Sequence, residues 1–194
     1  MNEPQKEKIV RKSFIYLFIF LALIIFLKLI NIQDIILKKI YVKDYSEYVY
    51  KYATDYNLDP LLVFAVIKTE SNFKVDATSS SNAIGLMQLM ENTALEVSDN
   101  IDEKINSKEE LYNPEINIKL GAKYLSELLE RYDNNLNMTL AAYNAGIGNV
   151  TDWVKKGIIK ADGSDIENIP FKETNNYVRK ILRDYEIYRE IYDV

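Results

Sequence analysis

The chain of 194 residues contains no cysteine and no histidine, and it has few glycines and prolines. Without cysteine there is no disulfide framework, thiol nucleophile or iron–sulfur cluster. Without histidine there is no Ser-His-Asp triad, no HExxH metal site and no imidazole acid–base pair. If the protein is an enzyme working near neutral pH, we therefore expect its proton carrier to be a carboxyl group in an unusual environment.

The first 43 residues differ in charge from the rest of the chain. They hold eight Lys and Arg against three Asp and Glu, whereas residues 44–194 carry a net charge of −10. An acidic domain is a poor candidate for nucleic acid, because affinity for nucleic acid depends on neutralising phosphates. We therefore expect two parts with different roles and no nucleic-acid partner.

A long apolar run, FIYLFIFLALIIFL, begins at Phe14 and follows a basic N-terminus. A helix of about 20 residues spans the roughly 30 Å hydrocarbon core of a bilayer. The run therefore predicts a transmembrane signal anchor at 13–32, between a cytoplasmic tail at 1–12 and a juxtamembrane linker at 33–43. The basic residues before it place the N-terminus in the cytoplasm and residues 44–194 outside. A cleaved signal peptide is the alternative, but no small-residue cleavage site follows the run.

Residues 44–194 contain the helix start signals that are typical of a helical domain. Asp59-Pro60 and Asn113-Pro114 each combine an N-cap residue with a proline at the first helical position. The helix that Pro60 opens is apolar nearly all round, which is typical of a buried central helix. No long alternating run indicates a sheet, although a short hairpin near 76–87 is compatible with the pattern. The fold class is therefore predicted to be all-α.

Glu70 is the candidate proton carrier. It ends the apolar helix, three and four residues after Ile67 and Val66, a spacing that places its carboxyl group on the apolar face. Desolvation disfavours the charged form, so we expect a raised pKa, as a general acid requires. The alternative from spacing alone is that Glu70 points into solvent at a frayed helix end.

Several short motifs then occur in order around this residue. They are Glu70-Ser71, Ser79, the segment AIGLMQ at 83–88, the segment AAYNAG at 141–146, and the segment ETNNYV at 173–178. Together they resemble the soluble lytic transglycosylase (SLT) domain, a goose-lysozyme-like helical module that cleaves bacterial peptidoglycan. The resemblance covers roughly residues 45–192, and the order and spacing of the motifs make it specific.

The resemblance implies a role for each matched residue. Glu70 matches the catalytic acid, and the substrate-binding positions of the family fall on Ser79, Met87, Gln88, Tyr143, Asn144, Glu173 and Tyr177. Structural roles are the alternatives for several of them: Met87 and Tyr177 as packed side chains, and Glu173 as a charge at a helix N-terminus. The chain departs from the family pattern at Asn82, where glycine is frequent, and at Glu91, where proline is frequent.

The implied reaction needs no metal and no cofactor. In the family, the acid protonates the glycosidic oxygen between N-acetylmuramic acid and N-acetylglucosamine, and the muramyl C6 hydroxyl then attacks to give a 1,6-anhydro end. Substrate assistance replaces the second carboxylate of ordinary glycosidases; Asp76 is nearby in sequence but lies outside the motifs. A hydrolytic muramidase of the same fold and a non-catalytic glycan-binding scaffold remain alternatives. The expected partners are peptidoglycan strands and, through residues 13–32, the bacterial membrane.

Overall fold

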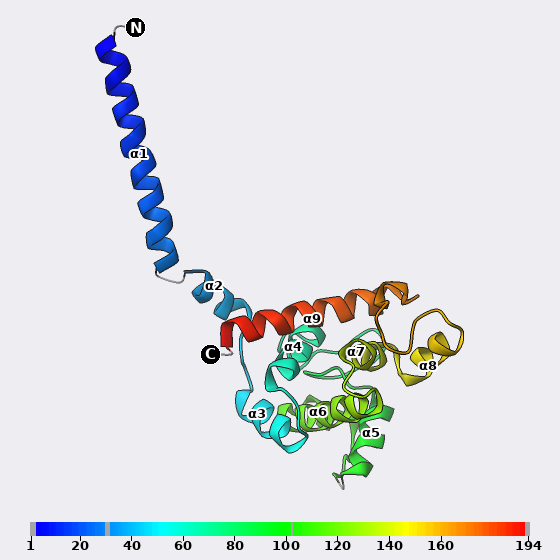
Figure 1. The fold of residues 1–194 in the computed structure, drawn as a ribbon. Coiled ribbons are helices and arrows are strands. Elements are labelled where there is room, and N and C mark those ends of the chain that lie inside the picture. The colour runs from blue at the N-terminus through cyan, green and yellow to red at the C-terminus, as the bar shows by residue number, and fades with distance from the viewer. Residues whose placement is uncertain (1–2, 30–31, 102, 193–194) are drawn as a thin grey trace. The chain divides into compact units, whose positions relative to one another are not determined.

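The computed structural model describes residues 3–29, 32–101 and 103–192, and the chain divides into two units, Met1–Val42 and Lys43–Val194. Within the described residues there are helices and isolated β-bridges but no strand, which confirms the all-α fold class. The helices, labelled in Figure 1 apart from the 3₁₀ turns η1 and η2, are α1 (Glu3–Leu29), α2 (Ile32–Ile40), α3 (Ser46–Asp55), α4 (Pro60–Glu70), α5 (Glu91–Asn100), η1 (Lys108–Tyr112), α6 (Pro114–Arg131), α7 (Leu136–Ala145), α8 (Ile147–Lys155), η2 (Ile166–Asn168) and α9 (Lys172–Tyr192).

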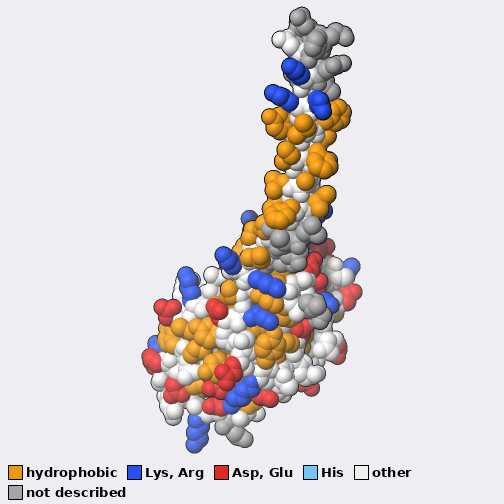
Figure 2. Space-filling view, turned by 90° about the vertical axis from the view of Figure 1, so that its left-hand side faces the viewer, with side chains coloured by type: hydrophobic (Ala, Val, Ile, Leu, Met, Phe, Trp, Pro, Cys, Tyr) orange, Lys and Arg blue, Asp and Glu red, His pale blue; other side chains and the backbone are white. Residues whose placement is uncertain are grey.

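The smaller unit consists of α1 and α2. Large apolar side chains from Phe14 to Leu27 are exposed along α1, and Figure 2 shows them beyond a basic N-terminal stretch. Of the predicted spanning segment 13–32, residues 13–29 lie in α1 and Ile32 is the first residue of α2, whereas residues 30 and 31 lie outside the described residues. Among the helices of the described residues, none is both long and apolar enough to cross a membrane.

Helix α4 forms the centre of the larger unit. The Asp59 side chain accepts a hydrogen bond from the Leu61 amide at 2.8 Å, and Pro60 occupies the first turn, so the predicted cap is confirmed. Every residue from Leu61 to Ile67 is buried. Helix α9 packs along α4, and the rings of Phe64 and Tyr188 stack with centroids 5.9 Å apart. Burial of an aromatic side chain contributes roughly 2–3 kcal/mol, so this contact helps to hold α9 against α4.

The connection between α4 and α5, residues 71–90, is irregular rather than a hairpin of two strands. Isolated bridges join Thr78 to Ile84 and Ile84 to Leu89. The Ser71 hydroxyl donates to the carbonyls of Ile67 and Leu86, which ties the connection to the end of α4. We call residues 71–90 the active-site loop below, because most of the candidate residues lie on it or against it.

Helix α6 packs directly against the active-site loop. A Cβ atom at Gly121 would lie 2.4 Å from Sδ of Met87, so only glycine lets the helix approach the loop this closely. The predicted cap of α6 is confirmed, because the Asn113 side chain accepts from the Glu115 and Ile116 amides.

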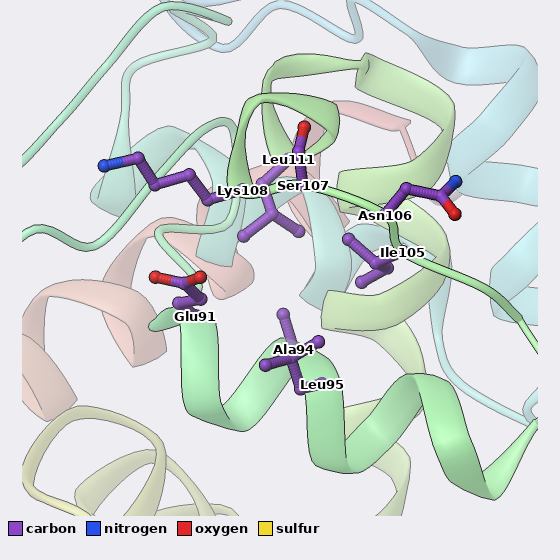
Figure 3. A pocket seen from close by; sticks show the side chains of 8 residues that line it. All are labelled: Glu91, Ala94, Leu95, Ile105, Asn106, Ser107, Lys108 and Leu111. Atoms are coloured by element: carbon purple, nitrogen blue, oxygen red, sulfur yellow. The ribbon is translucent and has the colours of Figure 1, made fainter.

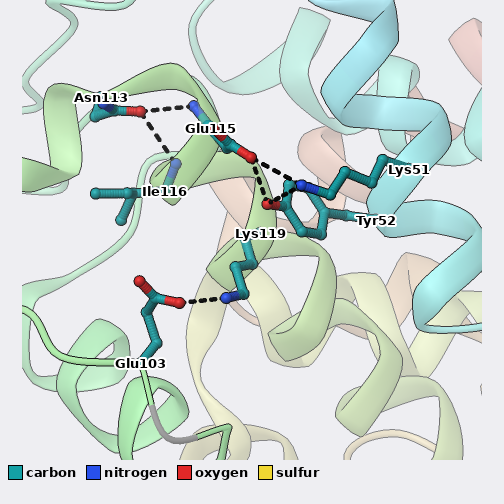
Figure 4. A network of polar contacts seen from close by, with 7 residues as sticks. All are labelled: Lys51, Tyr52, Glu103, Asn113, Glu115, Ile116 and Lys119. Carbon is teal, nitrogen blue, oxygen red and sulfur yellow. Dashed lines mark hydrogen bonds and ion pairs between the residues drawn. The ribbon is translucent and has the colours of Figure 1, made fainter.

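Polar contacts join α6 to its neighbours (Figure 4). The ammonium group of Lys51 and the hydroxyl of Tyr52, both on α3, bond Oε1 of Glu115 at 2.9 and 2.8 Å. Lys119 bonds Glu103 in the segment that follows α5. Exposed pairs of this kind contribute at most about 1 kcal/mol each, so they orient α3 and α6 while the apolar core supplies most of the stability.

Candidate active site

Glu70 is the last residue of α4, and the carboxyl group is held by a residue more than 100 positions later. The hydroxyl of Tyr177, on α9, donates to Oε1 of Glu70 at 2.6 Å. The pKa of Glu70 is raised to about 7, chiefly by burial and to a smaller extent by the negative charge of Glu173. The Tyr177 hydrogen bond and the charge of Lys180 act in the opposite direction. At neutral pH the group is therefore divided between its acid and carboxylate forms, as a residue that first donates and then accepts a proton requires.

Replacing Tyr177 with Phe should move the pH profile of any reaction that uses Glu70 as an acid. The hydroxyl stabilises the carboxylate, so its loss should raise the pKa of Glu70 above about 7. Because the acid form is the active one, the alkaline limb of kcat/KM should then shift to higher pH. The measurement is a pH–rate profile of wild type and Tyr177→Phe. An alkaline limb that stays at the same pH or shifts to lower pH would contradict the role of the Tyr177 hydroxyl in stabilising the Glu70 carboxylate.

Tyr143 joins α7 to the active-site loop beside Glu70. Its hydroxyl donates to the Met87 carbonyl at 2.9 Å, and its ring lies 5.2 Å from that of Tyr124. Burial, and then the negative charge of Glu70, raise the pKa of Tyr143 well above its ordinary value. Tyr143 therefore stays protonated at neutral pH and places a neutral donor next to the acid.

Gln88 and Ser79 shape the active-site loop through their own hydrogen bonds. Gln88 has a φ of 48°, and its Nε2 donates to the carbonyls of Ala77 and Gly85 at 3.1 and 2.9 Å. The Ser79 hydroxyl accepts from the amides of Ser81 and Ala83. Both predicted residues are half-buried, and each holds the loop as well as presenting an edge to the surface.

A hollow of about 220 Å³ lies beside these residues, and we call it the inner hollow. Three of the predicted binding residues line it, together with residues of α6 and α7: Gln88, Leu89, Met90, Thr93, Tyr124, Tyr143, Asn144, Ala145 and Gly146. The Oδ1 atom of Asn144 accepts from the Thr174 hydroxyl at 2.7 Å, so α9 also fixes this residue. The inner hollow is the best candidate for a sugar-binding position in the neighbourhood of Glu70.

Met87 does not have the position that we predicted for it. Its side chain is fully buried against Gly121, so it supports the loop from within and does not form the wall of a groove. Met90 takes the exposed position instead, with 45% of its surface accessible, and it lines the inner hollow. Tyr177 is also buried, so its role is to hold Glu70, whereas Glu173 is exposed in the first turn of α9.

Asn117, on α6, is a residue that sequence reasoning missed. Its side chain is fully buried, its Nδ2 donates to the carbonyls of Ile84 and Leu111, and its Oδ1 accepts from the Met87 amide at 2.7 Å. The signal in the sequence was an amide on the apolar stripe of a helix, where an unpaired polar group is costly. Asn117 therefore fixes the part of the active-site loop whose carbonyl receives Tyr143.

The acidic residues of the described ranges do not form a metal centre: no group of three or more Asp or Glu side chains in residues 3–29, 32–101 and 103–192 is arranged to hold an ion. Glu173 is the acidic residue whose charge acts on Glu70, and Asp76 is exposed on the active-site loop. The arrangement thus has one desolvated carboxyl group next to two neutral tyrosine hydroxyls.

Comparison with known proteins agrees with this geometry. The family model described as the transglycosylase SLT domain matches residues 47–164. The chain belongs to this family. Six of the candidate residues, from Glu70 to Asn144, lie inside the matched range of the SLT domain. Glu173 and Tyr177 lie beyond it on α9, although the structure brings Tyr177 into contact with Glu70.

Individual SLT relatives are similar over most of this chain. The soluble lytic murein transglycosylase of Escherichia coli K12 is 31% identical over 147 residues, which is 75% of this chain and 23% of that protein. An inactive glutamate-to-glutamine mutant of the lytic transglycosylase Slt from Pseudomonas aeruginosa superposes with a TM-score of 0.71 and 37% identity, covering 77% of this chain and 24% of the other. A complex of the 70-kDa soluble lytic transglycosylase with bulgecin A gives a TM-score of 0.73 at 31% identity, over 79% and 25% of the two chains. This chain therefore spans about a quarter of the length of these relatives.

Proposed function

We propose that this protein is a peptidoglycan lytic transglycosylase. The observation that carries the proposal is Glu70, a desolvated carboxyl group with a pKa of about 7 that is held by Tyr177. Its charge also acts on Tyr143, which lines the inner hollow. The relatives named as lytic murein transglycosylases support the reaction type, and the inactive glutamate-to-glutamine mutant of the Pseudomonas relative supports a glutamate as the essential group.

The proposed reaction uses Glu70 twice. Because Oε1 accepts from Tyr177, the acid proton resides on the other carboxyl oxygen, and it passes to the glycosidic oxygen as the muramyl C1–O bond breaks. The substrate's acetamido group stabilises the positive charge at C1. The Glu70 carboxylate then takes the proton of the muramyl C6 hydroxyl, whose oxygen forms the new bond to C1. The products are a 1,6-anhydromuramyl end and a free N-acetylglucosamine 4-hydroxyl, and no water is consumed.

The test is mass spectrometry of the fragments released from purified sacculi by the full-length protein. A transglycosylase gives anhydromuramyl ends, whereas a hydrolytic muramidase gives ends heavier by one water. Release of hydrolytic ends alone would replace the proposal with the muramidase. Release of no fragment, with binding to sacculi retained, would favour the glycan-binding scaffold.

We further propose that residues 13–32 hold the protein at the bacterial membrane, with the N-terminus in the cytoplasm and the catalytic domain outside. The apolar run in the sequence, the basic residues before it and the exposed apolar side chains of α1 support this proposal. A catalytic domain that begins about a dozen residues beyond the segment would act on glycan strands close to the membrane.

Cell fractionation should test the anchor. The wild-type chain is expected in the membrane fraction after carbonate extraction, and protease added to intact protoplasts should remove residues 44–194. Each lysine at the centre of a spanning helix costs about 3 kcal/mol of insertion free energy, so the variant Ile19→Lys/Leu23→Lys should move to the soluble fraction. Wild-type protein in the soluble fraction would contradict the anchor, and protection from protease would reverse the orientation.

A further inference from the structure

Helix α2 connects the apolar run of α1 to the catalytic domain, and its own apolar side chains are open. Ile35, Ile36 and Ile40 are exposed, each by more than half of its surface. Ile32, Ile36 and Ile40 follow one another at intervals of four residues, so they form one row along the helix, which we call the isoleucine row. The helix therefore has an apolar face although it lies beyond the long apolar run.

Lysines occupy the last turn of α2. Lys38 and Lys39 are both exposed. Successive residues are about 100° apart around a helix, so Lys38 lies nearly opposite Ile36. Lys39 lies closer to the isoleucine row, and its long side chain can carry the ammonium group away from an apolar surface. An apolar face combined with lysines is typical of a helix that lies in the plane of a membrane interface.

The exposed apolar side chains of the catalytic domain are placed differently. Among the described residues from Lys43 on, the large ones are Tyr50, Met90, Leu95, Tyr112 and Phe171. Met90 and Tyr112 line hollows, and Leu95 lines the hollow between α5 and η1 that Figure 3 shows. Phe171 packs edge-on against Trp153. A concave surface suits a ligand rather than a flat lipid surface, whereas the face of α2 has no such shape.

Tyr50 differs from these side chains because it lies beside the first residue of the catalytic domain. The ammonium group of Lys43 donates to the Tyr50 hydroxyl at 3.0 Å. Tyrosine and lysine are both suited to a membrane–water interface, where an apolar body meets lipid and a polar end meets water. Two residues separate Ile40 from Lys43, so the chain allows at most about 11 Å between their Cα atoms. A lipid surface that receives α2 would therefore lie close to Lys43 and Tyr50.

The charge of the chain favours the same segment. Residues 28–43 contain four lysines and one aspartate, whereas residues 44–194 carry a net charge of −10. Each lysine near an anionic lipid surface raises the affinity about fivefold, and an acidic domain is repelled by such a surface. The basic segment is thus the part that anionic headgroups attract, and α2 lies within it.

We propose that α2 is an interfacial helix, which lies in the headgroup region of an anionic membrane with the isoleucine row toward the acyl chains and Lys38 toward the water. The inference rests on the proposed anchor, because the apolar run of α1 must bring α2 to the membrane. It makes α2 a second attachment rather than a spacer. The start of the catalytic domain is then held at the lipid surface, so the enzyme acts on the glycan strands nearest the membrane.

The absence of cysteine allows a fluorophore to be placed at one position at a time. The full-length protein is reconstituted in vesicles of phosphatidylcholine and phosphatidylglycerol, with a nitrobenzoxadiazole label at Ile36→Cys, Ile40→Cys or Lys38→Cys. One quencher is a lipid with a nitroxide high on its acyl chain, and the other is iodide in the water. The control label is at Glu96→Cys, an exposed position on α5.

The labels at positions 36 and 40 should be quenched by the nitroxide lipid and protected from iodide. An interfacial helix buries its apolar face about 5–10 Å into the boundary between headgroups and acyl chains, which is the depth of this nitroxide. The label at position 38 should show the reverse, with iodide quenching several-fold stronger than at position 36. The control label should be quenched by iodide alone.

Three outcomes would overturn the inference. Equal iodide quenching at positions 36, 38 and 40 would make α2 a spacer in water. Protection from iodide without quenching by the nitroxide lipid would mean that protein covers the isoleucine row. Nitroxide quenching as strong at position 38 as at position 36 would mean that the label, and not a face of the helix, enters the lipid.

The anchor is tested separately with a label at Leu23→Cys, in the apolar run of α1. Quenching there by a lipid with its nitroxide near the end of the acyl chain, together with iodide quenching at positions 36 and 40, would overturn the interfacial helix alone. Iodide quenching at position 23 would overturn the anchor. The release of anhydro ends from sacculi by the same variants tests the proposed reaction, and it does not depend on where the labels lie.

Discussion

Glu70→Gln should abolish the release of anhydromuramyl ends while the domain stays folded. Glutamine retains an oxygen that can accept from Tyr177, so the contact between α4 and α9 is preserved. It cannot donate the proton that the leaving oxygen needs or take one from the C6 hydroxyl. Loss of general acid–base catalysis costs about 10²–10⁴-fold in rate, and a residue that serves in both steps should lie at the upper end or beyond it. Product analysis from sacculi is the measurement.

The same substitution should make the protein more stable at alkaline pH. The folded pKa of Glu70 is about 7, above its ordinary value of 4.5, so the unfolded chain loses this proton first as the pH rises. Stability is therefore lost between pH 4.5 and 7, and the loss is complete above pH 7. Since one pKa unit corresponds to about 1.4 kcal/mol, the cost is on the order of 3 kcal/mol, and glutamine does not incur it.

Urea unfolding at pH 8 and pH 4 separates this effect from an ordinary change in packing. Glu70→Gln should unfold at higher urea than wild type at pH 8, and the difference should disappear near pH 4. The matched control is Glu96→Gln on α5, an exposed carboxyl that should leave stability within about 0.5 kcal/mol at both values. A glutamine variant that retains activity would remove Glu70 from the mechanism, and equal stability at both pH values would show that the carboxyl group is solvated.

Local sequence was sufficient for the elements that carry Glu70. The caps at Asp59 and Asn113 are local contacts, and the position of Glu70 follows from the helical spacing of the apolar residues before it. The contact with Tyr177 spans 107 positions, and only the motif resemblance indicated that the two segments belong to one site. A pattern of apolar residues contains no information on which distant hydroxyl will meet a given carboxyl.

The assignment of Met87 shows where local reasoning ends. Met87 and Met90 are equally apolar, and a sequence pattern cannot say which of them faces outward in an irregular loop. Gln88, between them, has a positive φ, which turns the backbone so that Met87 points to Gly121 and Met90 to the surface. Conformations of this kind depend on hydrogen bonds that exist only in the folded loop, such as those of Gln88 Nε2 to the carbonyls of Ala77 and Gly85.

Asn117→Ala should have the largest effect on stability among substitutions outside Glu70. It removes three buried hydrogen bonds, and it leaves the Met87 amide and the Leu111 carbonyl without the partners that they have now. Each unsatisfied buried group costs about 1–3 kcal/mol, so we expect a loss of about 3–5 kcal/mol in the free energy of unfolding. Urea unfolding measures it, with Asn100→Ala, an exposed amide on α5, as the control expected within about 0.5 kcal/mol.

The Asn117→Ala variant should also show whether Asn117 positions the active-site loop for catalysis or only stabilises the fold. At a temperature where Asn117→Ala is still folded, kcat/KM should remain below that of wild type, because the Met87 carbonyl that accepts from Tyr143 is no longer fixed by the neighbouring amide. Asn117→Asp tests the same point with the volume unchanged: its Oδ1 can still accept from Met87, but its second oxygen faces two carbonyls in place of a donor. If either variant unfolds like Asn100→Ala and keeps full activity, Asn117 does not hold the active-site loop. If stability falls while the activity of the folded fraction is unchanged, the amide supports the fold and the position of Tyr143 is fixed by α7 alone.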